Sequence, residues 1–257
     1  MHKEKKTIVI SGSSKGVGFE IARQFNKDDN DLILIARNFH KNFKKEFRNP
    51  GSISLIKKGI DDKFIIDEID SVIHKKKLNF PNIIINNSGG PDPKKPGEIT
   101  EDEFKNYIEV GLIGFIRVMK KYTPIMRKNK WGRIINIGST VSKEPSPIMA
   151  TSASVRSALN AYSKSLSIDL ADAGITVNTI NLGGVLTDRI KYLFSKIADE
   201  TGVSVEEKIR EAESSIPMKR FAEPTEVAYL VDFLCSKKAN YITGQVISID
   251  GGLSKSL

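Results

Sequence analysis

Short apolar runs alternate with longer amphipathic segments along most of this 257-residue chain. The runs are rich in Ile, Val and Leu, and they occupy residues 7–11, 32–36, 53–56, 82–86, 133–137, 176–181 and 246–249. Apolar residues at helical spacing mark the segments near 16–27, 62–77, 101–128, 150–172 and 224–236. This alternation predicts βαβ units, and right-handed crossovers then place helices on both faces of a parallel sheet. We therefore expect an α/β fold with a doubly wound, Rossmann-type sheet of about seven strands.

The domain organisation follows from the absence of a linker rich in Pro, Gly or Ser, so residues 1–257 are expected to form a single domain. Residues 183–218 interrupt the alternation and hold two helical patterns, near 187–199 and 204–214. Ligands of such sheets bind at the carboxyl ends of the strands, and this insertion follows a strand. We expect residues 188–215 to form a small helical lid over a substrate.

Net charge alone leaves several partners open. Lys and Arg number 40 against 31 Asp and Glu, which gives a formal charge of +9. Such an excess suits nucleic acid, an anionic surface or an anionic cofactor. The cations are scattered and no helix-turn-helix or aromatic ribonucleoprotein motif is present, so no nucleic-acid partner is expected.

Cysteine and hydropathy patterns indicate the compartment. The single cysteine, Cys235, excludes a disulfide framework and a multi-cysteine metal site, and no metal is expected. It is predicted to be a buried structural thiol. The apolar run after the charged N-terminus is too short for a signal peptide, and no stretch of eighteen apolar residues occurs. We expect a soluble, cytoplasmic protein with no membrane partner.

A glycine-rich turn, Ser11-Gly-Ser-Ser-Lys-Gly-Val-Gly18, follows the first predicted strand and opens a helix. Gly12, Gly16 and Gly18 allow the backbone to approach a pyrophosphate, and the helix N-terminus offers free N–H groups. The Gly-Lys-Ser/Thr ending of a nucleoside triphosphatase loop is absent. The turn therefore predicts a dinucleotide site, with a purely structural turn as the alternative.

The end of the second strand bears on which dinucleotide is bound. An acidic residue there would bind the ribose 2′-hydroxyl of NAD, but this strand is followed by Arg37. A guanidinium suits the 2′-phosphate of NADP through charge-assisted hydrogen bonds, and Lys15 adds a second cation. NADP is favoured, and NAD stays possible if both residues are ordinary surface cations.

Taken in order, these motifs resemble the short-chain dehydrogenase/reductase family over essentially the whole chain. Besides the glycine turn, the resemblance is carried by Asn86-Asn-Ser-Gly89, Arg133-Ile-Ile-Asn-Ile-Gly-Ser139, Gly174-Ile-Thr-Val-Asn178, Gly183-x-x-x-Thr187 and several motifs of the C-terminal third. It implies cofactor contacts from Gly12, Ser14, Lys15, Gly16, Val17, Gly18, Arg37, Asn87, Ser88, Gly89, Arg156, Gly183 and Thr187. It also implies a homotetramer, and basic residues at 15 and 37 go with NADP in this family.

The catalytic positions implied by the resemblance are only partly conserved in this chain. Ser139 fits the family's active-site serine, but Ser152 stands where a tyrosine is expected and Arg156 where a lysine is expected. Gly111 stands at the position of the family's asparagine, and Gly59 at that of an adenine-side aspartate. The chain thus resembles an atypical branch with Ser…Arg, whose members are described as similar to 3-oxoacyl-carrier-protein reductases. We take Ser139, Ser152 and Arg156 as the catalytic candidates.

These replacements leave the proton donor open. A phenol titrates near pH ~10 and is tuned by a nearby cation, whereas a serine hydroxyl is a far weaker acid and arginine stays protonated. Tyr162 lies about 15 Å further along the same predicted helix as Ser152, so a packing role is expected for it. Water or a residue of the lid (Asp188, Arg189 or Tyr192) is the remaining source.

Two functions follow. The first is an NADP-dependent oxidoreductase that interconverts a small-molecule carbonyl and alcohol by hydride transfer. The alternative is a dinucleotide-binding protein without dehydrogenase turnover, acting as a redox sensor or interaction protein. A Ser-His-Asp hydrolase is not expected, because the three histidines (2, 40 and 74) lie outside every predicted strand end.

Overall fold

A single parallel sheet forms the centre of the computed structural model, which describes residues 5–27 and 30–256. Its strand order is β3-β2-β1-β4-β5-β6-β7, the doubly wound arrangement that the sequence predicts. The strands are β1 (Thr7–Ser11), β2 (Asp31–Ile35), β3 (Ile53–Ile56), β4 (Ile83–Asn86), β5 (Gly132–Ser139), β6 (Ile175–Leu182) and β7 (Val246–Ile249). Each predicted run coincides with one strand to within two residues at either end.

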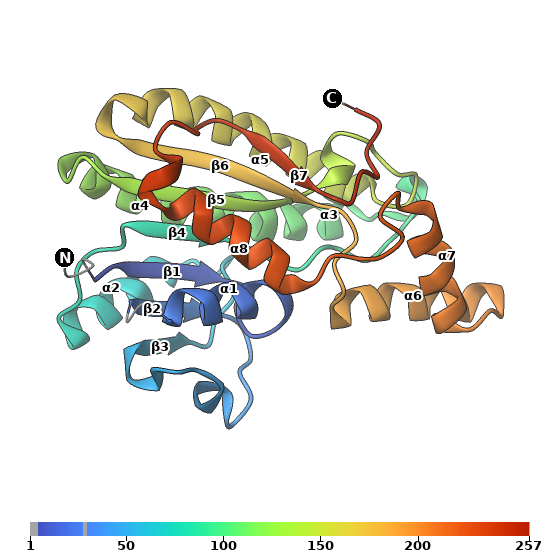
Figure 1. Ribbon diagram of the computed structural model, residues 1–257, viewed down its shortest axis with the longest axis horizontal. Coiled ribbons are helices and arrows are strands. Elements are labelled where there is room, and N and C mark those ends of the chain that lie inside the picture. Colours follow the sequence, from blue (N-terminus) through green and yellow to red (C-terminus); the bar gives the residue numbers. More distant parts are fainter. Residues whose placement is uncertain (1–4, 28–29, 257) are drawn as a thin grey trace.

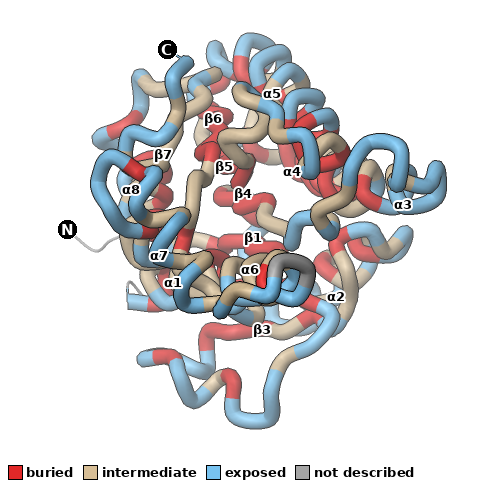
Figure 2. The backbone as a smooth tube through the Cα atoms, turned by 90° about the vertical axis from the view of Figure 1, so that its right-hand side faces the viewer, coloured by how far each residue is buried: buried red, intermediate tan, exposed pale blue. Residues whose placement is uncertain are grey.

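Helices cover both faces of this sheet (Figure 1). One face carries α1 (Gly16–Asn26) and α8 (Pro224–Cys235), which pack side by side. The other carries α2 (Ile65–Lys76), α4 (Gly114–Lys128) and α5 (Ala150–Leu170). Along β1, Ile8 and Ile10 face the first layer and Val9 faces the second, so every position of the strand is buried. Burial on both faces explains the continuous apolar runs, which appear as the buried centre of Figure 2.

Cys235 ends α8 inside the first of these layers and is buried, as predicted for a structural thiol. Burial raises the pKa of this thiol to about 12, so it is protonated at neutral pH.

The segment predicted as one helix over 101–128 is not continuous. It comprises α3 (Glu101–Ile108), a π-helical turn (Glu109–Ile113) and α4. In the middle of the π turn and directly after it, Gly111 and Gly114 pack so tightly that an added Cβ would lie 2.9 Å from Val155 Cγ1 and 2.6 Å from the Ile60 carbonyl oxygen, respectively. Helical periodicity cannot reveal a π turn, which inserts a single residue into the helix and is set by such contacts.

The insertion after β6 forms two helices, α6 (Asp188–Thr201) and α7 (Val205–Ser215), close to the predicted 188–215. They lie beyond the carboxyl ends of the strands, and Figure 2 shows α6 from this side. Among residues 5–27 and 30–256, no helix combines the length and apolar character needed to cross a bilayer.

Candidate active site

The glycine turn between β1 and α1 has the conformation that its sequence predicts. Gly12 and Gly16 adopt φ values of +59° and +57°, which residues with a Cβ rarely adopt. At Gly18 the constraint is steric, because an added Cβ would lie 2.3 Å from the Gly12 carbonyl oxygen. The turn is therefore tight enough for its backbone to approach a pyrophosphate closely.

The loop after β4 is joined to this turn. Asn87 Nδ2 donates to the Gly12 carbonyl oxygen at 2.9 Å, and Ser11 Oγ donates to the Asn87 carbonyl oxygen at 2.8 Å. From the other side, Thr187 Cγ2 lies 3.2 Å from the Cβ position of Gly16. Residues from three distant segments, after β1, β4 and β6, thus meet at the carboxyl edge of the sheet.

The N-terminus of α1 fits a phosphate group. Lys15 is its N-cap residue, yet its side chain makes no capping hydrogen bond, and the first turn contains no acidic residue. The Ser13 backbone N–H donates to the Ile35 carbonyl oxygen at 3.3 Å, and this bond joins the turn to the end of β2. Lys15 follows Ser13 by two residues, Arg37 follows Ile35 by two residues, and both cations are exposed. Two exposed cations thus follow the junction between the turn and β2 in the chain, and such cations can bind an extra phosphate.

Asp61 lies against the glycine found at the expected aspartate position. Its Oδ1 lies 2.1 Å from where a Cβ on Gly59 would be, so the carboxylate occupies the space of an aspartate side chain at 59. The Asp62 backbone N–H donates to the Gly59 carbonyl oxygen at 3.2 Å, so the loop after β3 turns at this point. The shift was visible in the sequence as Asp61-Asp62, but its consequence depends on the loop conformation.

Ser139 ends β5, and its Oγ accepts the Val141 backbone N–H at 3.4 Å. Three residues later, Ser142 Oγ donates to the Ser139 carbonyl oxygen at 2.8 Å. The same Oγ accepts from Asn160 Nδ2 of α5 at 2.9 Å and from Asn181 Nδ2 of β6 at 2.8 Å. Ser142 therefore fixes the backbone at Ser139 relative to α5, the helix that carries Ser152 and Arg156. Sequence reasoning missed this junction, because its members lie far apart in the chain.

Ser152 and Arg156 lie one turn apart on α5, and both are buried. Arg156 Nη2 donates to Ser88 Oγ at 2.9 Å, which brings α5 to the loop after β4. Arg156 Nη1 is buried and has no hydrogen-bond partner among the described residues. This free donor fits the ribose contact that the family resemblance implies for position 156.

Two of the alternative proton donors have other roles in the structure. Tyr162 packs against the second helix layer, and burial raises the pKa of its phenol. Arg189, on α6, donates to the Pro91 carbonyl oxygen and pairs with Asp92 at 3.3 Å. Asp188 and Tyr192, on the same helix, are exposed.

The histidines show no hydrolase arrangement. His40 pairs with Glu46, and a ring nitrogen of His74 lies at the Asp70 carbonyl oxygen. His2 lies outside the described residues. No group of three or more His, Cys, Asp or Glu side chains placed to hold a metal occurs in the part of the chain that the structure describes.

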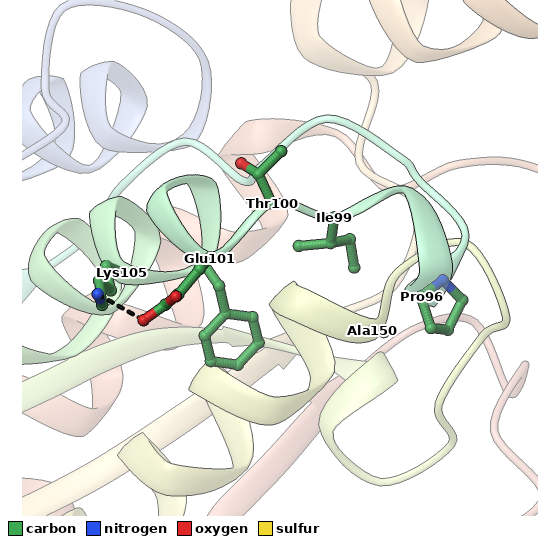
Figure 3. A pocket seen from close by; sticks show the side chains of 7 residues that line it. Pro96, Ile99, Thr100, Glu101, Lys105 and Ala150 are labelled. Atoms are coloured by element: carbon green, nitrogen blue, oxygen red, sulfur yellow. Dashed lines mark ion pairs between the residues drawn. The ribbon is translucent and has the colours of Figure 1, made fainter.

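A hollow of about 520 Å³ lies beside the start of α5 (Figure 3). Its lining consists of Pro96, Ile99, Thr100, Glu101, Phe104, Lys105 and Ala150. Glu101 and Lys105 pair with one another at 2.6 Å on α3. The hollow contains none of the predicted site residues, so it does not by itself identify a substrate.

Known proteins resemble this chain along nearly its full length. A family model described as "Enoyl-(Acyl carrier protein) reductase" matches residues 12–254. The "NADPH-dependent reductase BacG" of Bacillus subtilis (strain 168) is 31% identical over 98% of this chain and 99% of its own length. A "3-oxoacyl-[acyl-carrier-protein] reductase FabG" of Staphylococcus epidermidis is 29% identical over 96% of this chain and 98% of its own. Among solved structures, that of YwfH, an NADPH-dependent reductase involved in bacilysin biosynthesis, aligns with a TM-score of 0.89 and 30% identity, covering 99% of this chain and 100% of that one.

Proposed function

Since the chain belongs to the short-chain dehydrogenase/reductase family, we propose that it is an NADP-dependent oxidoreductase that interconverts a carbonyl and an alcohol. The observation that carries this proposal is the tight turn of Gly12, Gly16 and Gly18 at the uncapped N-terminus of α1. When bound, the nicotinamide supplies or accepts the hydride. The relatives named as 3-oxoacyl-carrier-protein reductases make a 3-oxoacyl compound the first substrate class to test.

For the cofactor, we assign the 2′-phosphate to Lys15 and Arg37, and the adenine side to Asp61. We assign the remaining contacts to residues around the glycine turn and the loops after β4, β5 and β6: Ser14, Val17, Asn87, Ser88, Gly89, Arg156, Gly183 and Thr187. The hydrogen bonds that join Asn87 to the turn support this assignment.

For the chemistry, we assign to Ser139 the orientation and polarisation of the substrate oxygen. Arg156 keeps a fixed positive charge beside the developing alkoxide, because a guanidinium does not titrate in proteins. Ser152, one turn before Arg156, fills the position of the missing tyrosine, but its hydroxyl is a far weaker acid than a phenol, and any proton it gave up would have to be replaced from solvent. We therefore assign the proton to water that enters beneath the lid formed by residues 188–215.

Oxidation of NADPH with acetoacetyl-coenzyme A and a panel of simple ketones tests the assignment. Ser139→Ala and Arg156→Met should each lower the rate at least tenfold, whereas Ser154→Ala, an exposed position on α5, should not change it. Equal rates in all four proteins would refute the site. NADPH binding without oxidation in the presence of any of these carbonyl compounds would favour the second candidate, a dinucleotide-binding protein without turnover. The absence of the family's Tyr and Lys from positions 152 and 156 suggests this candidate.

For assembly and location, we propose a cytoplasmic homotetramer. Large apolar side chains are exposed on and after α8 (Tyr229, Phe233 and Tyr241) and on α5 (Ile168), and β7 is an edge strand whose residues are only half-buried. Such surfaces favour contacts between copies of the chain. Light scattering that reports a monomer would contradict the tetramer.

A further inference from the structure

Arg156 is a buried cation without a counter-ion. Only 4% of its surface is exposed, and it forms no ion pair with any carboxylate among the described residues. Its one short hydrogen bond is to Ser88 Oγ. A buried charge is stable only where other groups replace its lost hydration, so something else must hold this guanidinium in place.

Two aromatic rings hold the Arg156 guanidinium in place. The guanidinium carbon lies 5.7 Å from the ring centroid of Tyr107, on α3, and 5.8 Å from that of Phe115, on α4. Both distances are within the range of a cation–π interaction, which strengthens when the cation is desolvated. Phe115 is fully buried and Tyr107 is 6% exposed, so both rings are shielded from water.

Gly111, one helical turn further on, packs against the Tyr107 ring at an ordinary contact distance and more closely against Val155, the neighbour of Arg156 on α5. A Cβ at Gly111 would lie 3.4 Å from Tyr107 Cζ and 2.9 Å from Val155 Cγ1. The Tyr107 hydroxyl is buried and has no hydrogen-bond partner among residues 5–27 and 30–256. A hydroxyl without a partner contributes nothing to holding the ring, so the side chain acts through its aromatic face.

We propose that Tyr107 is a positioning residue for Arg156. The ring keeps the guanidinium oriented so that Nη2 stays on Ser88 and Nη1 stays available to the cofactor. The inference rests on the role proposed above for Arg156, and its test separates the two.

The test is a double-mutant cycle on NADPH affinity, measured by fluorescence titration without any substrate. Tyr107→Leu should weaken NADPH binding by about 3- to 30-fold, the range that a desolvated cation–π contact supplies. In the Arg156→Met background the same substitution should have no further effect, because the ring then has no cation to hold. The conservative variant Tyr107→Phe should restore affinity to within about twofold and should not lower the melting temperature.

Tyr122→Leu is the control, because Tyr122 is a buried tyrosine of α4 whose hydroxyl donates to Asp70, and the rings that contact the Arg156 guanidinium among the described residues are those of Tyr107 and Phe115. It should lower the melting temperature but leave NADPH affinity unchanged. If Tyr107→Leu does not fold, Tyr107→Met, which fills more of the space of the ring without an aromatic face, replaces it in the cycle and should show the same dependence on Arg156.

Three results would overturn the inference: additive losses in the cycle, a Tyr107→Phe defect as large as that of Tyr107→Leu, or an equal NADPH defect in Tyr122→Leu. If Arg156→Met alone binds NADPH as tightly as the parent and turns over equally fast, the proposed role of Arg156 fails, and the inference fails with it. Additive losses alone would overturn only the role of Tyr107.

Discussion

Gly18→Ala is the most direct perturbation of the cofactor site, because its effect can be worked out from the backbone. The added Cβ would lie 2.3 Å from the Gly12 carbonyl oxygen and 2.8 Å from Asn87 Nδ2. The Gly12 oxygen belongs to the backbone and cannot rotate away, so either the turn or the start of α1 must move by roughly 1 Å to restore a normal contact.

The expected cost follows from two opposing effects. Overpacking a tight site costs about 1–3 kcal/mol, while exchanging glycine for alanine within a helix returns up to about 1 kcal/mol. The helix gain is the same in the free and the cofactor-bound protein, so it offsets the loss of stability but not a loss of affinity. If restoring the close approach to the pyrophosphate costs 1–3 kcal/mol on binding, NADPH affinity becomes about 5- to 150-fold weaker. Asn87 should lose its hydrogen bond to Gly12 in the same movement.

The measurement is a fluorescence titration with NADPH, together with the melting temperature with and without the cofactor. Gly51→Ala is the matched control, because a Cβ there would meet only Asn49 Oδ1, at an ordinary 3.6 Å. A Gly18→Ala protein that binds NADPH within twofold of the parent, with an unchanged melting temperature, would refute the argument that this backbone is packed for a close approach.

Three further predictions concern other parts of the site. Replacing Lys15 and Arg37 together by alanine should weaken NADPH binding by about 3- to 30-fold more than NADH binding, because each exposed charge contact contributes a few tenths to 1 kcal/mol. Equal losses for both cofactors would contradict the 2′-phosphate assignment. Arg189→Met removes the contacts that α6 makes with Pro91 and Asp92. The dissociation rate of NADPH, measured by stopped flow, should therefore become several-fold faster. An unchanged dissociation rate would mean that these contacts do not close the site. A hydrogen bond from Arg220 holds the pKa of Glu226 at about 2. The ionised carboxylate therefore contributes its full stabilisation above pH 4.5 and loses it as the pH falls toward 2, so the difference in melting temperature between the parent and Glu226→Gln should narrow over that range. A constant difference would show that ionisation of Glu226 does not affect stability.

The parts of the site predictable from sequence are those encoded by neighbouring residues. The glycine turn is one, since three glycines, a preceding strand and a following helix lie within about twenty residues. The Ser…Arg pair is another, because its two members lie one turn apart on one helix. Both predictions depend only on local backbone geometry, which short-range spacing determines.

The remaining parts depend on contacts between distant segments. Tyr107 lies 49 residues before Arg156, and nothing in the periodicity of α3 distinguishes it from an ordinary core residue. One signal was present: Tyr107 is four residues before Gly111, so a large ring and a missing side chain share one face of the helix. Ser142 gave no such signal, because its partners Asn160 and Asn181 come from α5 and β6.

Positions 111 and 156, where this chain differs from the family's catalytic pattern, are physically connected. This connection argues against independent loss of the family's catalytic residues at the two positions. An asparagine at 111 is excluded while Val155 and the Tyr107 ring occupy their positions. A lysine at 156 would keep the charge but lose the flat guanidinium, which contacts two rings and Ser88 at once. A side chain at 111 would press on Val155, the neighbour of Arg156 on α5, so it would disturb position 156 as well. These side chains surround a guanidinium whose charge does not change with pH. The arrangement fits a reaction in which the positive charge of Arg156 stays fixed and the proton comes from outside this group of side chains.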